Sequence, residues 1–100
     1  MPDLSISREV REVEGKKIEV IHLAGFIDSH TFPQFESAIN EALESGARHF
    51  LLDMQGLNYI NSTGLGLLMS LYRQVRQDAG DLAVTHTSEK ITNIFDLLGF

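Results

Sequence analysis

Two adjacent hydroxyl side chains, Ser62 and Thr63, stand where the residue pattern of the chain changes, within YINSTGLGLLMSLYRQV (59–75). The residues before Asn61 read as the end of a strand, and those after Gly66 follow a helical pattern, so both hydroxyls fall where a helix begins. Serine is a preferred N-cap residue because its oxygen accepts a hydrogen bond from an otherwise unpaired backbone N–H. A hydroxyl at a helix N-terminus is also well placed to carry a phosphate, since the exposed N–H groups and the positive end of the helix dipole stabilise the added charge. The sequence therefore predicts that Ser62 caps this helix, and it permits a second role for Ser62 as a phosphorylation site.

The glycines beside these hydroxyls argue against a nucleotide-binding loop. Gly64 and Gly66 follow a strand and open a helix, as the glycines of a dinucleotide-binding fingerprint do, but Met69 occupies the position of the third glycine. No lysine follows to complete a phosphate-binding P-loop. The simpler interpretation is close backbone packing at the start of the helix.

The remaining reactive side chains form no recognisable catalytic or metal-binding motif. The four histidines lack the i, i+4 pairing and the H-E-x-x-H spacing of zinc sites: His22, His30, His49 and His86. A Ser-His-Asp hydrolase could be composed from Asp53, Ser62 and His86, but Ser62 lacks the G-x-S-x-G elbow. Asp28 and Asp53 each sit near a predicted strand end, where either could be a solvated turn residue, and nothing local pairs them as acid and base. We therefore expect a protein that is not an enzyme and has no catalytic residue, no metal site and no cofactor.

Composition and charge exclude several further classes. One hundred residues build one hydrophobic core, so we expect a single domain over residues 1–100. The formal net charge is −6 and the eight Lys and Arg residues are scattered, which argues against a nucleic-acid platform. The chain has no cysteine, hence no disulfide or thiolate metal site, and no apolar run near the roughly 20 residues that span a bilayer. The N-terminus lacks the apolar core of a signal peptide, so we expect a cytoplasmic protein that does not enter the membrane.

The elements that position these residues begin with strands. Apolar and polar side chains alternate near the N-terminus, and a turn signal at 14–17 precedes a second apolar run. We therefore predict an antiparallel hairpin, with strands over 1–13 and 16–25. Two more short apolar runs are predicted to be strands: 49–54 and 82–84.

Three helices are predicted from apolar residues at helical spacing. The first begins after Thr31, which fits a capping box with Gln34, and Gly46 closes it. The second covers 65–78, and Ser88 caps the third. Their predicted apolar faces consist of Phe32, Phe35, Ile39, Ala42 and Leu43, of Leu65, Leu68, Leu71, Tyr72 and Val75, and of Ile91, Ile94, Phe95 and Leu98. The order β-β-α-β-α-β-α implies an α/β fold with a mixed, mainly parallel sheet, an N-terminal β-hairpin and helices packed on it.

The stretch LLDMQGLNYINSTGLGLLMSLYRQV (51–75) resembles the signature of the STAS family, specifically of the bacterial anti-sigma factor antagonists. In that family a strand ending in Asp leads through a short apolar-aromatic loop to an acidic residue, a Ser, a second Ser or Thr, then Gly-Leu-Gly and a helix. LAGFIDSHT (23–31) resembles the second strand and the loop before the first helix, with Asp28 at the position of the usual Asp. ITNIFDLLGF (91–100) resembles the penultimate helix. The resemblance covers residues 18–100 in order.

The resemblance implies a STAS-like β/α domain whose serine, here Ser62 with Thr63 in reserve, is phosphorylated by its partner. The implied partner is an anti-sigma factor with a histidine-kinase-like ATPase fold that acts on serine. The unphosphorylated antagonist binds this partner and thereby releases the sigma factor, and phosphorylation switches the binding off. A metal-dependent serine phosphatase resets the cycle. The partner-binding residues expected on this basis are Asp28, Asn61, Ser62, Thr63 and Gly64.

Two features depart from the pattern of the family. Asn61 stands where the family usually has Asp, which removes a carboxylate beside Ser62 but keeps a residue that caps helices equally well. The sequence stops at Phe100, where family members commonly continue into another strand and a last helix, and less covered apolar surface at a sheet edge would favour self-association. The alternative to a switch is a non-switching STAS scaffold in a stress-sensing assembly or a transporter complex, with Ser62 only a cap. A small hydrolase that uses Ser62 is the third hypothesis.

Overall fold

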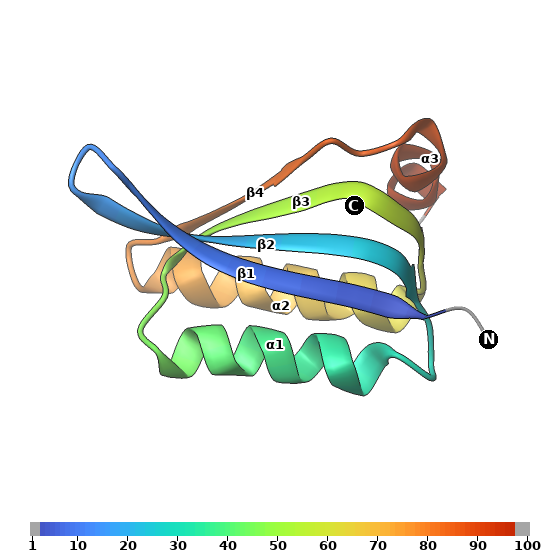
Figure 1. Ribbon diagram of the computed structural model, residues 1–100, viewed down its shortest axis with the longest axis horizontal. Coiled ribbons are helices and arrows are strands. Elements are labelled where there is room, and N and C mark those ends of the chain that lie inside the picture. Colours follow the sequence, from blue (N-terminus) through green and yellow to red (C-terminus); the bar gives the residue numbers. More distant parts are fainter. Residues whose placement is uncertain (1–2, 98–100) are drawn as a thin grey trace.

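The computed structural model describes residues 3–97, which fold into four strands and three helices (Figure 1). In chain order these are β1 (Leu4–Val13), β2 (Lys16–Ile27), α1 (Phe32–Glu44), β3 (His49–Ile60), α2 (Ser62–Gln77), β4 (Asp81–Thr85) and α3 (Glu89–Leu97). The predicted order of elements is confirmed. Leu98, predicted on the apolar face of the third helix, lies outside the described residues. Within those residues, no helix is both long enough and apolar enough to cross a membrane.

The four strands form one mixed sheet in the order β1-β2-β3-β4. β1 pairs antiparallel with β2, whereas β2 with β3 and β3 with β4 are parallel pairs, as predicted. The hairpin turns at Glu14 and Gly15, both with positive φ (53° and 81°), in a two-residue loop whose twist matches that of the flanking strands. β3 is longer than the predicted run because it continues past Met54 to Ile60. Its register against β2 shifts there, and such a bulge breaks the period-two pattern on which strand prediction depends.

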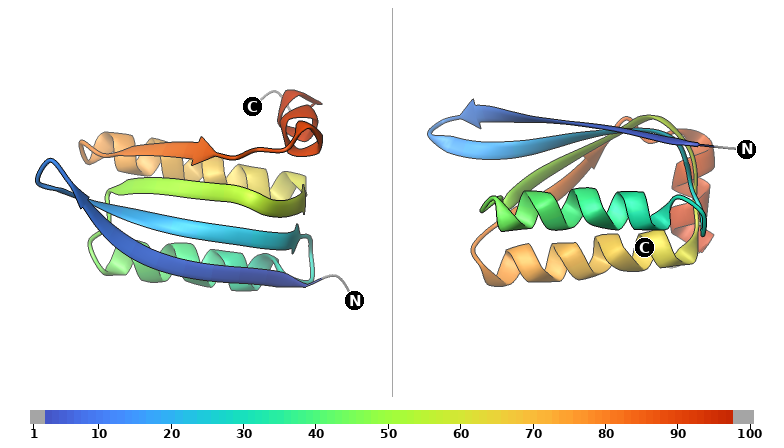
Figure 2. Two further views of the ribbon diagram at one scale, coloured as in Figure 1. Left: turned by 45° about the horizontal axis from the view of Figure 1, so that its top comes forward. Right: turned by 60° about the horizontal axis from the view of Figure 1, so that its bottom comes forward.

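The helices are unevenly distributed over the sheet. α1 and α2 lie side by side along one face, and α3 packs against β3 at the end of the sheet where α2 begins (Figures 1 and 2). Over the rest of the other face, no helix of the described chain covers the strands. The buried helix side chains are those at helical spacing: Phe35, Ile39, Ala42, Leu65, Leu68, Leu71, Val75, Ile91 and Phe95. Tyr72 was predicted among them but is 42% exposed, because it lies at the margin of the buried face of α2. The centre of its ring is 5.8 Å from the Arg76 guanidinium.

The helix ends agree with prediction at two places and differ at one. Ser88 Oγ accepts a hydrogen bond from Ile91 N (3.2 Å), so it caps α3 as predicted. Gly46 (φ 97°) closes α1 in a Schellman motif, in which Gly46 N and Ala47 N donate to the last carbonyls of the helix. The capping box of α1 is wrong, because the Thr31 side chain makes no cap hydrogen bond. The Gln34 amide instead donates to the Leu4 carbonyl of β1 (2.9 Å).

Candidate functional site

The junction between β3 and α2 is built around Asn61. Its backbone is extended (φ −86°, ψ 174°), its N–H donates to the Ile27 carbonyl at the end of β2 (2.9 Å), and its Oδ1 accepts from Gly64 N (2.8 Å). Asn61 is therefore the N-cap of α2, and the prediction that Ser62 is the cap is wrong. An N-cap residue needs a non-helical backbone, whereas Ser62 is already the first helical residue.

The side chains of Ser62 and Thr63 are exposed at this helix start. Among residues 3–97, neither hydroxyl takes part in a hydrogen bond. The backbone N–H groups of the first turn of a helix have no partner within the helix and carry the positive end of its dipole. The Ser62 hydroxyl is thus exposed, has no hydrogen-bond partner in the described part of the chain, and lies where an added negative charge is stabilised.

The glycine beneath the hydroxyls holds the first turn of α2 close to the sheet. A Cβ atom on Gly64 would lie 2.8 Å from Ile27 Cγ2 and 2.9 Å from Ile60 Cγ1, closer than side-chain atoms pack. A Cβ on Gly66 would meet nothing within 4 Å. Gly64 is therefore required for packing below the site, and it is buried rather than part of the exposed surface.

Asp28 follows β2 directly and lies next to the junction, because Asn61 is bonded to Ile27. The Asp28 carboxylate accepts from His30 N (3.0 Å) and from Thr31 N (3.1 Å). The bond from the Thr31 backbone N–H, followed by that from His30, holds the pKa of Asp28 below its usual value. Asp28 thus stays ionised and half-buried beside the start of α2. The structure brings the five predicted binding residues to one edge of the sheet.

α3 contributes apolar side chains to the surface beside Ser62, which the sequence did not predict. A shallow groove of about 260 Å³ is lined by Tyr59, Ile60, Asn61 and Ser62 on one side and by Ile94 and Leu97 on the other. Leu97 is 84% exposed there. No local signal links residues some thirty positions apart, so only the packing of α3 against β3 reveals that its apolar side chains border Ser62.

The hydrolase hypothesis fails on geometry. His86 Nδ1 lies 3.1 Å from Asp53 Oδ1, so two of the three supposed catalytic residues do meet. Ser62 lies beyond the C-terminal end of β3, however, and six strand residues lie between Asp53 and Ile60, a distance of roughly 20 Å. The triad is not assembled. Residues 3–97 also contain no group of three or more His, Asp or Glu side chains arranged to hold a metal ion.

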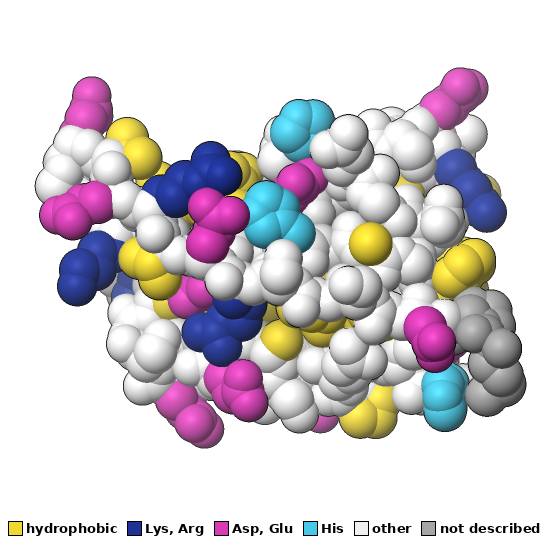
Figure 3. All heavy atoms as spheres, in the orientation of Figure 1, with side chains coloured by type: hydrophobic (Ala, Val, Ile, Leu, Met, Phe, Trp, Pro, Cys, Tyr) yellow, Lys and Arg dark blue, Asp and Glu magenta, His cyan; other side chains and the backbone are white. Residues whose placement is uncertain are grey.

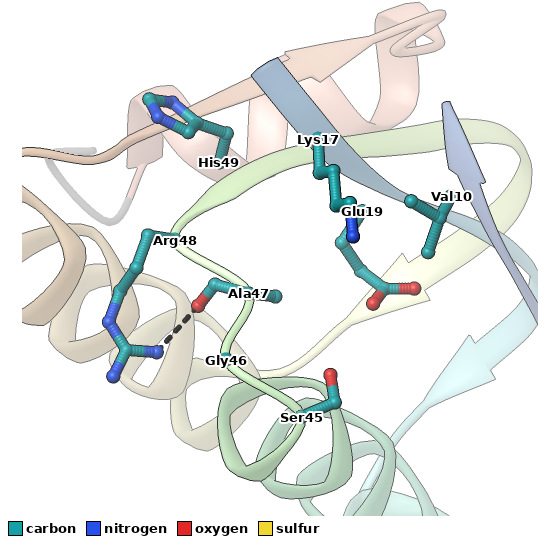
Figure 4. A pocket seen from close by; sticks show the side chains of 8 residues that line it. All are labelled: Val10, Lys17, Glu19, Ser45, Gly46, Ala47, Arg48 and His49. Atoms are coloured by element: carbon teal, nitrogen blue, oxygen red, sulfur yellow. Dashed lines mark hydrogen bonds between the residues drawn. The ribbon is translucent and has the colours of Figure 1, made fainter. Parts of the chain in front are cut away.

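A second pocket, of about 270 Å³, lies at the opposite end of the sheet between the end of α1 and the β-hairpin (Figure 4). Two of its charged side chains, Arg48 and Glu19, already have partners within the fold. The Arg48 guanidinium donates to the Ala47 carbonyl (2.7 Å), and the Glu19 carboxylate, only 4% exposed, is paired with Arg8 (3.3 Å). The structure thus favours the Ser62 end as the functional site.

Comparison with known proteins decides the family. Residues 8–100 match the profile of the STAS domain. The chain belongs to the STAS domain family. Over 83 residues this STAS domain is 25% identical to an anti-sigma-B factor antagonist of Staphylococcus aureus, a match that covers 83% of this chain and 77% of that protein.

Solved structures show the same fold. An anti-sigma factor antagonist from Mycobacterium paratuberculosis superposes with a TM-score of 0.75 at 24% identity, covering 95% of this chain and 79% of that one. The Bacillus protein SpoIIAA in its phosphorylated form superposes with a TM-score of 0.67 at 24% identity, covering 93% of this chain and 86% of that one. The unphosphorylated form of SpoIIAA is also similar, with a TM-score of 0.68 at 23% identity and coverage of 91% and 83%. The predicted STAS-like fold is therefore confirmed.

Proposed function

We propose that this STAS domain is an anti-sigma factor antagonist that is switched off when Ser62 is phosphorylated. The observation that carries the proposal is the exposed Ser62 hydroxyl, which has no partner within residues 3–97 and begins a helix that Asn61 caps. Because the fold does not use this hydroxyl, its modification can change a contact surface and leave the fold intact. The names of the relatives, and the existence of SpoIIAA in both phosphorylation states, support this role.

The energetics of a phosphate at Ser62 differ between the domain and its partner. Phosphorylation adds about −1.5 to −2 charges, which the first-turn N–H groups and the dipole of α2 favour. A partner surface fitted to a neutral hydroxyl would instead bury an unpaired anion, which costs several kcal/mol of binding. The modified domain therefore stays folded but loses its partner.

The partner that fits is an anti-sigma factor with a histidine-kinase-like ATPase fold that phosphorylates serine. The contact surface consists of Asp28, Asn61, Ser62 and Thr63, supported from below by Gly64. The partner supplies the catalysis, and the STAS domain itself is not an enzyme. A metal-dependent serine phosphatase returns the domain to its binding form, and Thr63 is the reserve acceptor.

The test uses the serine-kinase anti-sigma factor of the same genome and ATP. We expect intact mass spectrometry to show one added phosphate on the parent and none on Ser62→Ala. Ser62→Asp should fold like the parent and bind the kinase at least about tenfold more weakly, which corresponds to about 1.4 kcal/mol. Ser70→Asp is the matched control, because it adds the same charge to an exposed serine about two turns further along α2, roughly 12 Å from Ser62 along the helix axis.

Two results would contradict the switch. One is an unchanged mass after incubation with kinase and ATP, and the other is a Ser62→Asp variant that binds as tightly as the parent. Tight binding by Ser62→Asp would favour the non-switching scaffold, in which the surface around Ser62 is indifferent to charge.

A further inference from the structure

A histidine on the uncovered face of the sheet lies between two carboxylates. His22 of β2 is flanked by Ile21 and Leu23, which point into the core, so its own side chain points to the other face. His22 Nδ1 is 2.8 Å from Asp53 Oδ2 on β3, and His22 Nε2 is 2.8 Å from Glu9 Oε2 on β1. Histidine and acidic side chains gather over the strands in Figure 3. One imidazole ring thus links the strands on both sides of β2.

The two contacts determine the protonation state of the ring. A neutral imidazole has one N–H donor, and its other nitrogen is an acceptor, whereas an ionised carboxylate can only accept. If His22 were neutral, one of its nitrogens would direct a lone pair at a carboxylate oxygen at 2.8 Å. Only the imidazolium, with both nitrogens protonated, donates to Asp53 and Glu9 together.

Both carboxylates are held in the ionised form. The Gln55 backbone N–H, followed by the His22 ring, lowers the pKa of Asp53, and the Arg11 side chain, followed by His22, lowers the pKa of Glu9. Arg11 Nε lies 2.6 Å from Glu9 Oε1. Neither carboxyl group is therefore expected to carry the proton and donate it in a hydrogen bond to a neutral His22 ring.

We propose that His22 is a proton-operated clamp that fastens the edge strand β1 to β3 across β2. When the proton is bound, the ring holds Glu9 and Asp53 at once. When the proton leaves, one of the two links must break, and the exposed β1 edge is the side free to move away. The clamp lies on a different part of the sheet from Ser62 and does not depend on the proposed phosphorylation.

The neighbouring charges set the direction of the response. Facing His22 are Glu9 and Arg11 from β1, Asp53 from β3, and His86, which follows β4 and lies 3.1 Å from Asp53. The hydrogen bond to Glu9, followed by that to Asp53, raises the pKa of His22 above its ordinary value of 6.5. A raised folded-state pKa gives stability that is fully present below the unfolded value and is lost as the pH rises through the folded value. The clamp therefore tightens in acid and loosens in base.

The direct test is nitrogen-15 NMR of the imidazole groups of the full chain during a pH titration. At pH 6.5, the ordinary pKa of histidine, we expect His22 to show mainly the doubly protonated ring, with a titration midpoint above that pH. Glu9→Gln, a change on the exposed edge strand that leaves the core untouched, should lower this midpoint, as should Asp53→Asn. A mainly neutral His22 at pH 6.5, or a midpoint that Glu9→Gln does not move, would overturn the proposal.

Stability measurements provide a second readout. At about pH 5.5, His22→Gln should lower the equilibrium constant for folding roughly two- to tenfold, the effect expected for the loss of two partly exposed ion pairs. At about pH 8.5 the effect should be smaller. His49→Gln is the control, because His49 is the first residue of β3 and forms no ion pair within residues 3–97. Equal effects of His22→Gln at both pH values would contradict the clamp.

Discussion

α1 and α2 begin at the same edge of the sheet, and the hydroxyls at their starts are used in opposite ways. The Thr31 hydroxyl, on a residue only 4% exposed, donates to the Phe26 carbonyl (2.7 Å) and accepts from Asp28 N (3.0 Å). The Ser62 hydroxyl is exposed and takes part in no hydrogen bond within residues 3–97. The Thr31 hydroxyl therefore holds the fold together, whereas the Ser62 hydroxyl is available for contacts at the surface.

The difference arises from the backbone before each helix. After β2, residues 28–31 form the turn before α1. In this turn the Asp28 backbone N–H donates to the Thr31 hydroxyl, and the Thr31 backbone N–H donates to the Asp28 carboxylate. After β3, Asn61 completes the turn and caps α2, and within residues 3–97 the hydroxyls of Ser62 and Thr63 form no hydrogen bond. A hydroxyl can act as a switch only if the fold is stable without it. We therefore expect the domain to tolerate modification of Ser62 but not of Thr31.

The largest effect is expected from Thr31→Ala. This change removes the partner of the Phe26 carbonyl and of Asp28 N in a buried site, and an unsatisfied buried group costs about 1–3 kcal/mol. We expect the free energy of unfolding in urea to fall by about 2 kcal/mol. Thr63→Ala is the matched control, an exposed threonine hydroxyl that should cost under about 0.5 kcal/mol. Equal losses in the two variants would show that burial does not distinguish these hydroxyls.

Gly64 and Gly66, both in the first turns of α2, should respond in opposite ways to substitution by alanine. Gly64→Ala forces a methyl group against Ile27 and Ile60, and such overpacking costs about 1–3 kcal/mol. Gly66→Ala meets open space in a helix and should stabilise the domain by up to about 1 kcal/mol. Thermal unfolding should therefore move in opposite directions for the two variants. A stabilising Gly64→Ala would mean that the junction is less tightly packed than the distances indicate.

A smaller effect is expected at Asn61, the residue that frees Ser62 from capping. Asn61→Ala loses the hydrogen bond to Gly64 N and should cost about 1 kcal/mol. Asn61→Asp keeps an acceptor and places a negative charge at the N-terminus of α2, so its stability should equal or exceed that of the parent by about 0.3–1 kcal/mol. Urea unfolding of the three proteins distinguishes these outcomes. If Asn61→Ala is neutral while Ser62→Ala is costly, the assignment of the cap is reversed.

Sequence patterns predicted the elements of this fold but not the structural roles of the hydroxyls of Thr31 and Ser62. Ser88 caps the start of α3 and Gly46 closes the end of α1, as predicted, because both helix ends use hydrogen bonds between residues close in sequence. The segment Asn61-Ser62-Thr63 offers three possible caps in a row, and a tertiary bond, from Asn61 N to the Ile27 carbonyl, decides which residue is extended. Local propensity cannot supply that bond.

The polar cluster on the open face was equally beyond sequence analysis. His22 and Asp53 are neighbours because β2 and β3 pair in one particular register, and His22 meets Glu9 because β1 pairs along the other side of β2. Nothing in the sequence pattern pairs His22 with Glu9 or Asp53, and Asp53 stands out only as a residue near a predicted strand end. Residues that meet across strands can be recognised only when the register is known.

The smallest effect on stability, and the most informative, is expected for Ser62→Ala. If Ser62 were the cap, the variant would lose about 1 kcal/mol. Because Asn61 Oδ1 already bonds Gly64 N and Ser62 is an exposed first-turn residue, we expect a change in the free energy of unfolding within about 0.5 kcal/mol of zero. The same variant should bind the anti-sigma factor like the parent and fail to accept phosphate. A loss near 1 kcal/mol would show that the Ser62 hydroxyl caps α2 after all. Ser62 would then be needed for stability, as Thr31 is, and the contrast between the two helix starts would fail.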